Sequence, residues 1–140
     1  MVRMYKKGAQ AERELIKLLK GKGFDPTRAA GSKGLMDIVA LHEGKAYVFQ
    51  VKYTKYDTIR IRRKEICKLV DLYYRHNPNP DKETTAVYLA VKFRRHGWRF
   101  YPVIKLWSLL SGVFDTFELK PKDGLPLDGL LNWLNHQISS

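Results

Sequence analysis

The chain of 140 residues is long enough for one compact domain, residues 1–140, and its 44% hydrophobic content excludes a disordered chain. A formal net charge of +12 favours an anionic partner, with nucleic acid first, and no apolar run is long enough to cross a membrane. A single cysteine, Cys67, excludes an intramolecular disulfide, the four scattered histidines form no zinc pattern, and without an apolar signal core we expect a cytoplasmic protein.

The first predicted element is an amphipathic helix over about residues 6–22. Leu15 and Leu19 recur at helical spacing, and glycines at the end of the segment stop the helix. Glu12 lies in line with these apolar positions, on or beside the buried face. A carboxylate in that position needs a partner. A neighbouring lysine or arginine would supply one, and so would a functional site.

Next come an extended segment, residues 24–30, and a loop, residues 31–34. Two strands follow over residues 36–42 and 45–53, and the sequence EGK between them predicts a β-hairpin.

Polar side chains interrupt both strands of the predicted hairpin. Asp37 opens the first strand, where an ordinary turn residue would also fit. Gln50 and Lys52 are two residues apart on the second strand and therefore share one face, and the hairpin brings Asp37 near them. The lysine either reaches solvent at an edge or faces a site. Together with Glu12, the pattern suits metal-assisted phosphodiester hydrolysis, since Mg²⁺ prefers oxygen ligands and an ammonium stabilises developing negative charge.

The second half of the chain predicts further helices and strands. A helix over residues 62–76 places Ile66, Leu69, Val70 and Tyr73 on one stripe, and residues 77–83 form a turn. Strands are expected over residues 84–93 and 98–103, with Trp98 and Phe100 packed in the sheet, and a closing helix over residues 127–138. Tyr73, Tyr74, Phe114 and Phe117 are candidates for a dimer surface or for ordinary core packing. This order of elements predicts a mixed α/β sandwich.

Several blocks of the chain resemble the archaeal Holliday junction resolvases, a family of the PD-(D/E)xK nuclease superfamily. The blocks are KKGAQAERELIKLL, GF, RAAGSK, DIVA, VKYTK, LAVKF and GWRF, in matching order and spacing over about residues 5–102. The resemblance implies a restriction-endonuclease-like α/β fold, with a central mixed sheet flanked by helices. It also implies a homodimer that makes paired nicks across a four-way DNA junction with Mg²⁺, or Mn²⁺ as a substitute, and with no small-molecule cofactor.

The resemblance also assigns roles to individual residues. By position, Glu12 and Asp37 correspond to metal-site carboxylates, and Lys52 corresponds to the catalytic lysine. Ser32 lies in a loop that contributes to catalysis in some relatives. Gln50 departs from the pattern, because the family has a glutamate at this position.

An amide at position 50 changes the expected strength of the metal site. The oxygen of Gln50 can still coordinate a hard cation, but it brings no charge. One charge pair at about 4 Å is worth roughly 4 kcal/mol at an effective dielectric constant of about 20. We therefore expect weaker metal binding and slower cleavage. Three explanations stay open: a natural site that still cuts, a natural paralogue that binds without cutting, and an engineered substitution.

Two windows carry nearly all of the excess of positive over negative charge. Residues 1–33 hold nine Lys or Arg against three acids, and residues 52–64 hold six against one. The sequence RIRRK, residues 60–64, is predicted to open the second helix, where each cation costs roughly a few tenths of a kcal/mol against the helix dipole. A function is therefore expected for these charges. We predict DNA contacts by Lys6, Lys7, Arg13, Arg28, Ser32 and Lys33 in the first window and by Lys55, Arg60, Arg62 and Arg63 in the second.

Four functions are compatible with the sequence. The first is a homodimeric, metal-dependent endonuclease that resolves four-way junctions. The second is a non-catalytic protein that binds junctions or branched DNA. The third is a nuclease of the same fold that cuts flaps or duplex DNA. The fourth, a basic RNA-binding protein, leaves the alignment of Glu12, Asp37 and Lys52 unexplained.

Overall fold

The computed structural model describes residues 2–29, 36–79 and 81–130, with the side chains of residues 2–7 left aside. A five-stranded sheet in the order β1-β2-β3-β5-β6 forms its centre, and β4 and β7 form a separate two-stranded ribbon. The elements are α1 (Val2–Gly21), β1 (Asp25–Arg28), β2 (Ile38–His42), β3 (Lys45–Thr54), β4 (Ile59–Arg62), α2 (Arg63–His76), β5 (Thr85–Phe93), β6 (Gly97–Pro102), α3 (Val103–Trp107) and β7 (Thr116–Leu119), with short 3₁₀ turns at Ser108–Ser111 and Pro121–Asp123.

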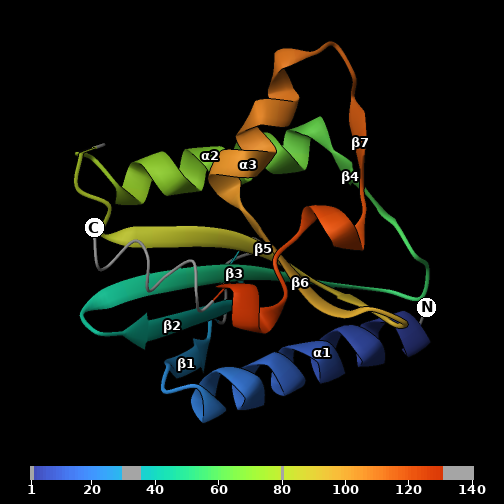
Figure 1. Ribbon diagram of the computed structural model, residues 1–140, viewed down its shortest axis with the longest axis horizontal. Helices are drawn as coiled ribbons and strands as arrows, with labels where there is room; N and C mark the ends of the chain where they lie inside the picture. The colour runs from blue at the N-terminus through green and yellow to red at the C-terminus, as the bar shows by residue number, and fades with distance from the viewer. Residues whose placement is uncertain (1, 30–35, 80, 131–140) are drawn as a thin grey trace.

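The sheet lies between two layers of helices, with α1 on one face and α2 and α3 on the other (Figure 1). Among the described strands, β3 and β5 alone run parallel, and α2 belongs to the crossover between them. The predicted mixed α/β architecture is therefore confirmed. None of the described helices is long and apolar enough to span a membrane.

Some predicted boundaries were wrong. Helix α1 begins at Val2, four residues before the predicted start. The RIRRK sequence opens the second helix only in part: Arg60 and Arg62 belong to strand β4, and α2 begins at Arg63. Strand β7 and helix α3 were not predicted. The closing helix starts at residue 127 as predicted, and its remainder, residues 131–138, lies outside the described residues.

The hairpin between β2 and β3 is built as the sequence predicts. His42 pairs with Lys45 across a two-residue turn, in which Glu43 has φ = 49° and Gly44 has φ = 79°. Positive φ at both positions is the geometry of the tight hairpin turn whose twist matches the flanking strands. The turn fixes the register of the two strands and, with it, which residues of β2 and β3 lie opposite each other.

Alternation along β3 divides its side chains between two cores. Tyr47 and Phe49 are buried against α1, while Val48 belongs to the core under α2. By the same alternation Gln50 and Lys52 project toward the α2 side. The fold thus places Lys52 against the start of α2, with Gln50 two residues earlier on the same face of the strand.

Each helix presents one apolar stripe to the sheet. From α1 the buried residues are Ala11, Leu15 and Leu19, and from α2 they are Ile66, Leu69 and Leu72. Val70 and Tyr73, predicted on the α2 stripe, are only partly buried, and Leu72 takes the central position. Trp98 and Phe100 stack on each other in the sheet at 6.3 Å between ring centroids, as expected.

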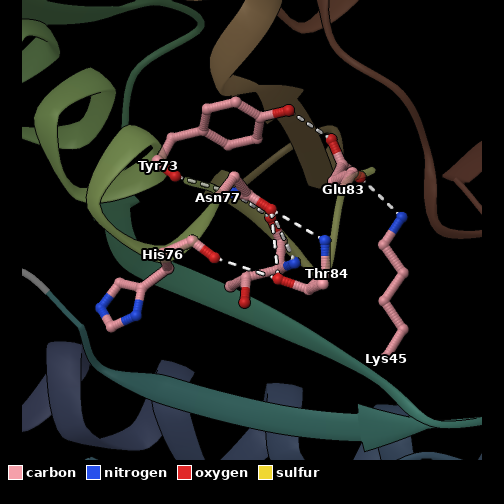
Figure 2. A network of polar contacts seen from close by, with 7 residues as sticks. Lys45, Tyr73, His76, Asn77, Glu83 and Thr84 are labelled. Carbon is pink, nitrogen blue, oxygen red and sulfur yellow. Dashed lines mark hydrogen bonds and ion pairs between the residues drawn. The ribbon is translucent and has the colours of Figure 1, made fainter. Parts of the chain in front are cut away.

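A buried amide joins the end of α2 to the start of β5 (Figure 2). Asn77 is 2% exposed, and its Nδ2 donates to the carbonyls of Tyr73 at 2.7 Å and Thr85 at 2.8 Å. Its Oδ1 accepts from the N–H groups of Thr84 at 2.8 Å and Thr85 at 3.0 Å. Beside it, Glu83 accepts from the Tyr73 hydroxyl and from the Lys45 ammonium. The network holds α2 against β3 and β5.

Replacing Asn77 with alanine is expected to lower the free energy of unfolding by about 2 kcal/mol, because buried backbone groups at the helix end lose their partners. Urea unfolding followed by circular dichroism measures the loss. Asn79→Ala is the matched control, since the Asn79 side chain is exposed and accepts one bond, from the Asp81 N–H at 3.1 Å. A change of less than about 0.5 kcal/mol is expected there. Equal losses in both variants would contradict the role given to Asn77.

Candidate active site

The strand register places Asp37 beside Gln50. Ile38 pairs with Phe49 in the antiparallel register, so Asp37, which precedes Ile38, lies opposite Gln50, which follows Phe49. The Asp37 N–H donates to the Phe49 carbonyl at 3.0 Å, and Asp37 Oδ2 accepts from the Val51 N–H at 2.7 Å. These two bonds anchor the carboxylate across β3. The predicted approach of Asp37 to Gln50 is therefore present in the structure.

The surroundings of Asp37 raise the pKa of its carboxyl group. Burial is the largest cause that raises the pKa of this carboxyl above its usual range, and the charge of Glu12 raises it further. The hydrogen bond from the Val51 N–H and the charges of Lys52 and Arg28 lower it, without cancelling the increase. Glu12 and Asp37 are thus close enough to repel each other, and a cation between them would relieve that repulsion.

Lys52 reaches from β3 to the first turn of α2, where its Nζ donates to Glu65 Oε1 at 3.0 Å. The other oxygen of Glu65 accepts from the Arg62 N–H at 3.0 Å, so the carboxylate also closes the start of the helix. Burial works against the charged form, yet the bonds from Arg62 and Lys52 hold the pKa of Glu65 below its usual range. Lys52 therefore faces an ionised carboxylate.

Glu65 is a candidate site residue that the sequence prediction missed. Its position three residues into a helix, after the N-cap residue Arg62, is the capping-box position, which is the only local signal it carries. That signal indicates a structural role at the start of α2. The contact with Lys52 depends on how α2 crosses the sheet.

Glu12 lies at the edge of the buried stripe of α1, with a side chain that is 18% exposed. Its Oε2 accepts from Arg28 Nη2 of β1 at 2.9 Å. The pairing with an arginine, one of the two explanations given for Glu12, is thus present. It does not remove Glu12 from the site, because the charges of both residues act on Asp37.

The described residues contain no group of three or more His, Cys, Asp or Glu side chains that could hold a metal ion. Asp37, Glu12 and the Gln50 amide nevertheless form an all-oxygen set, which suits a hard cation that keeps several waters. With two carboxylates and a neutral amide, the set offers a cation less negative charge than three carboxylates would.

The structure describes the side chains of some of the predicted DNA contacts and not of others. Arg13, Arg28, Lys55, Arg60 and Arg62 are exposed. Ser32 and Lys33 lie outside the described residues, and the side chains of Lys6 and Lys7 are not described.

Arg63, also predicted to contact DNA, has a structural role in this fold. Its guanidinium donates to the carbonyls of Leu110 at 3.0 Å, Phe114 at 2.9 Å and Gly112. Its side chain also lies over the ring of Phe117, 5.7 Å from the centroid. These contacts tie the start of α2 to the segment before β7, and the guanidinium is occupied by them.

A three-layer α/β protein that brings an aspartate, a polar residue and a lysine together on adjacent strands falls in the restriction-endonuclease-like class of nucleases. More narrowly, residues 3–139 match the family model of the archaeal Holliday junction resolvase (Hjc). The chain belongs to this family, which confirms the resemblance seen in its sequence blocks.

Individual relatives agree with the family match. The crossover junction endodeoxyribonuclease Hjc of Methanocaldococcus jannaschii is 36% identical over 89 residues, which cover 64% of this chain and 61% of that protein. The crossover junction endodeoxyribonuclease Hje of Saccharolobus islandicus is 29% identical over 118 residues, or 81% of this chain and 84% of that protein. The match to the first relative therefore spans less than two thirds of its length.

A solved structure supports the same fold. It is that of Hjc from Archaeoglobus fulgidus, described as a Holliday junction resolvase from an archaeal hyperthermophile. The two chains superpose with a TM-score of 0.69 at 27% identity, covering 90% of this chain and 96% of the other.

Proposed function

We propose that this chain is a structure-selective, metal-dependent DNA endonuclease that binds and resolves four-way junctions by hydrolysing phosphodiester bonds. The observation that supports the proposal most directly is the meeting of Asp37, Gln50 and Lys52 on the hairpin of β2 and β3. The relatives named above carry the corresponding activity in their names. The proposal treats residues 1–140 as one nuclease domain, because both helical layers pack on the same sheet.

The proposed roles follow from the chemistry of each side chain. Asp37, Gln50 and Glu12 would hold a divalent cation, Mg²⁺ first and Mn²⁺ as a substitute. When bound, such an ion neutralises the scissile phosphate and lowers the pKa of a coordinated water. Lys52 directs its ammonium at the developing negative charge, and Glu65 holds that ammonium in place. Val51 fixes the Asp37 carboxylate through its N–H.

Charge on the surface supports a DNA substrate. The exposed cations Arg13 and Arg28 lie on the α1 side, while Lys55, Arg60 and Arg62 lie on the loop and strand that follow β3. We propose that these groups bind phosphates on either side of the site, together with Lys6, Lys7, Ser32 and Lys33. Arg63 is left out of this set because carbonyl groups occupy its guanidinium. The family is archaeal, and DNA in a cell without a nucleus lies in the cytoplasm, so we propose a cytoplasmic location.

Cleavage of a four-way junction by the unaltered chain tests the proposal. Cleavage is expected with Mg²⁺ or Mn²⁺ and not with a chelator, and the junction should be bound more tightly than a duplex of equal length. Affinity should fall steeply with salt, as phosphate contacts release counterions. Equal affinity for junction and duplex would contradict junction selectivity, and equal cleavage with and without metal would contradict the proposed site.

A second candidate function is junction binding without cleavage. It is favoured by the missing third carboxylate, since the described part of the chain gathers no three-acid cluster and position 50 carries an amide. This candidate predicts tight binding to junctions and no metal-dependent product from the unaltered chain, so the same experiment separates the two.

We also propose that the chain forms a homodimer, because two copies related by twofold symmetry suit a substrate with two symmetric strands. An exposed apolar patch on α2 and α3 is the candidate interface. Tyr74, Ile104 and Trp107 are 44%, 52% and 50% exposed, and the rings of Tyr74 and Trp107 meet edge to face at 5.8 Å. Tyr73 and Phe117, the other sequence candidates, are half-buried, while Phe114 is 68% exposed.

The replacement Ile104→Asp is expected to weaken the dimer by at least about tenfold, because it buries a charge at the centre of the patch. Sedimentation over a range of protein concentrations measures the effect. Leu41→Asp is the matched control, since Leu41 is 54% exposed but lies on β2, away from α2 and α3. A dimer unaffected by Ile104→Asp would show that the interface lies elsewhere.

A further inference from the structure

An open hollow of about 370 Å³ lies beyond the end of β3, where the loop to β4 meets the β4–β7 ribbon. Tyr56, Thr58, Arg60 and Glu118 line it. Its volume is at the lower end of the roughly 300–1,000 Å³ typical of small-ligand sites. None of these four residues belongs to the hydrolytic cluster, so the hollow needs an explanation of its own.

The aromatic wall of this hollow is exposed, and its backbone is anchored to the end of β3. Tyr56 is 65% exposed, and its N–H donates to Oγ1 of the buried Thr54 at 3.2 Å. The ammonium of Lys55 lies 5.3 Å from the centroid of the Tyr56 ring. One exposed aromatic residue is ordinary in a folded protein. Held beside a cation and above a hollow, however, it has the features of a platform on which a nucleobase stacks.

The polar walls distinguish a base from a bare phosphate. Arg60 and Glu118 are direct partners across β4 and β7, so both reach the same side of the ribbon. A guanidinium binds a phosphate well. An ionised carboxylate can only accept hydrogen bonds, and it repels a phosphate. A nucleotide satisfies both, with its phosphate at Arg60 and Lys55 and the amino edge of its base at Glu118. A base that stacks on the Tyr56 ring has left the stack of the duplex, so the base is unpaired.

We propose that this hollow binds an unpaired nucleobase with donor groups on its edge, guanine first, at the branch point of the DNA. The inference rests on the proposed junction-cleaving function and adds a feature of the substrate to it. Tyr56 follows Lys52 by four residues, at most about 14 Å of extended chain. This backbone span corresponds to roughly four nucleotides at about 3.4 Å of axial rise each, so the captured base lies near the scissile phosphate. Capture of a base there favours a branch point over continuous duplex.

A fluorescent base tests the proposal. The substrate is a four-way junction with one unpaired 2-aminopurine at the branch point, mixed with protein and a chelator so that it stays uncut. 2-Aminopurine loses fluorescence when it stacks, and its amino group can donate to Glu118. The unaltered chain should quench it. Tyr56→Phe keeps an aromatic face and should bind within about twofold of the parent.

Tyr56→Leu is the decisive variant, because it keeps an apolar side chain and removes the aromatic face. It is expected to bind this junction about tenfold more weakly, without quenching, and to bind blunt duplex unchanged. Glu118→Gln should reduce the preference for an unpaired guanine over an unpaired thymine. Unchanged binding and quenching in Tyr56→Leu would overturn the base site.

A duplex with the same single bulged base separates the two proposals. If the parent binds junction and duplex equally, junction selectivity fails. If Tyr56→Leu nevertheless loses affinity for the bulged duplex, the base site stands. Loss of affinity for blunt duplex as well would overturn the base site, since it would indicate a general backbone contact.

Discussion

Replacement of Lys52 by methionine is expected to lower the rate of junction cleavage by about 10²- to 10³-fold, the usual cost of losing one group that stabilises transition-state charge. Methionine keeps much of the length of the side chain and removes only the ammonium, which the structure places beside Glu65. Binding of the uncut junction without metal should change by less than about threefold, because one cation among many is lost. Single-turnover cleavage at saturating protein measures the effect.

Lys45→Met is a close control for this change. Lys45 lies on the same strand, and its side chain is 23% exposed, against 26% for Lys52. It also forms an ion pair, with Glu83 at 2.6 Å, but at the opposite end of β3 (Figure 2). Loss of either pair should cost similar, small amounts of stability, whereas cleavage by Lys45→Met should stay within about twofold. Equal loss of cleavage in both variants would point to stability, not chemistry.

The parts of this fold that sequence predicts are those fixed by neighbours in the chain. The turn at Glu43 and Gly44 sets the hairpin, and alternation then places Gln50 and Lys52 on one face. Asp37 follows from the same register. Helical spacing likewise places Glu12 at the edge of the α1 stripe. Each of these predictions depends on interactions within a few residues, which a single sequence contains.

The ribbon of β4 and β7 was missed because its partners are far apart in sequence. Ile59–Arg62 pairs with Thr116–Leu119, more than 50 residues later, and each strand has only four residues. No turn connects them, so neither carries a hairpin signal. The basic residues of β4 precede a good helical pattern, which is why Arg60 and Arg62 were assigned to that helix. The hollow at Tyr56 depends on this same strand pairing, so the sequence did not predict it either.

The partners of charged side chains were the least predictable part of the site. Lys52 meets Glu65 because α2 crosses over β3, and Arg63 meets three carbonyls of a segment that lies about 50 residues further on. Local sequence shows these residues only as charges on a strand end and a helix start. Their roles as positioning group and structural clamp emerge from tertiary packing.

Placing a glutamate at position 50 is expected to strengthen metal binding by between about ten- and a hundredfold and to raise the cleavage rate at low Mg²⁺. One added charge at about 4 Å is worth roughly 4 kcal/mol at an effective dielectric constant of about 20. The loss of a coordinated water and the repulsion from Asp37 offset part of this gain in binding free energy. Calorimetric titration of Mg²⁺ without DNA measures binding, and cleavage rates across a Mg²⁺ series measure the consequence.

Gln50→Glu should also change stability in a way that depends on metal and pH. Without metal, the new carboxylate raises the pKa of Asp37, which burial and Glu12 already hold above its usual range. The folded protein then binds protons more tightly than the unfolded chain, so its stability increases as the pH falls toward that pKa. At neutral pH, added Mg²⁺ should offset the loss of folding stability that the added carboxylate causes. Thermal unfolding with and without metal follows both effects.

Asn79→Asp controls for the added charge, because Asn79 is exposed in the turn after α2 and its Oδ1 accepts from the Asp81 N–H in either form. It should leave Mg²⁺ affinity unchanged. Gln50→Met removes the amide oxygen, and a further loss of Mg²⁺ affinity would show that this oxygen is a ligand in the parent. If Gln50→Glu cuts and the parent does not, the chain is a junction-binding protein. If Gln50→Glu neither binds metal nor cuts with Glu12 and Lys52 intact, the hydrolytic site proposed on this hairpin is wrong.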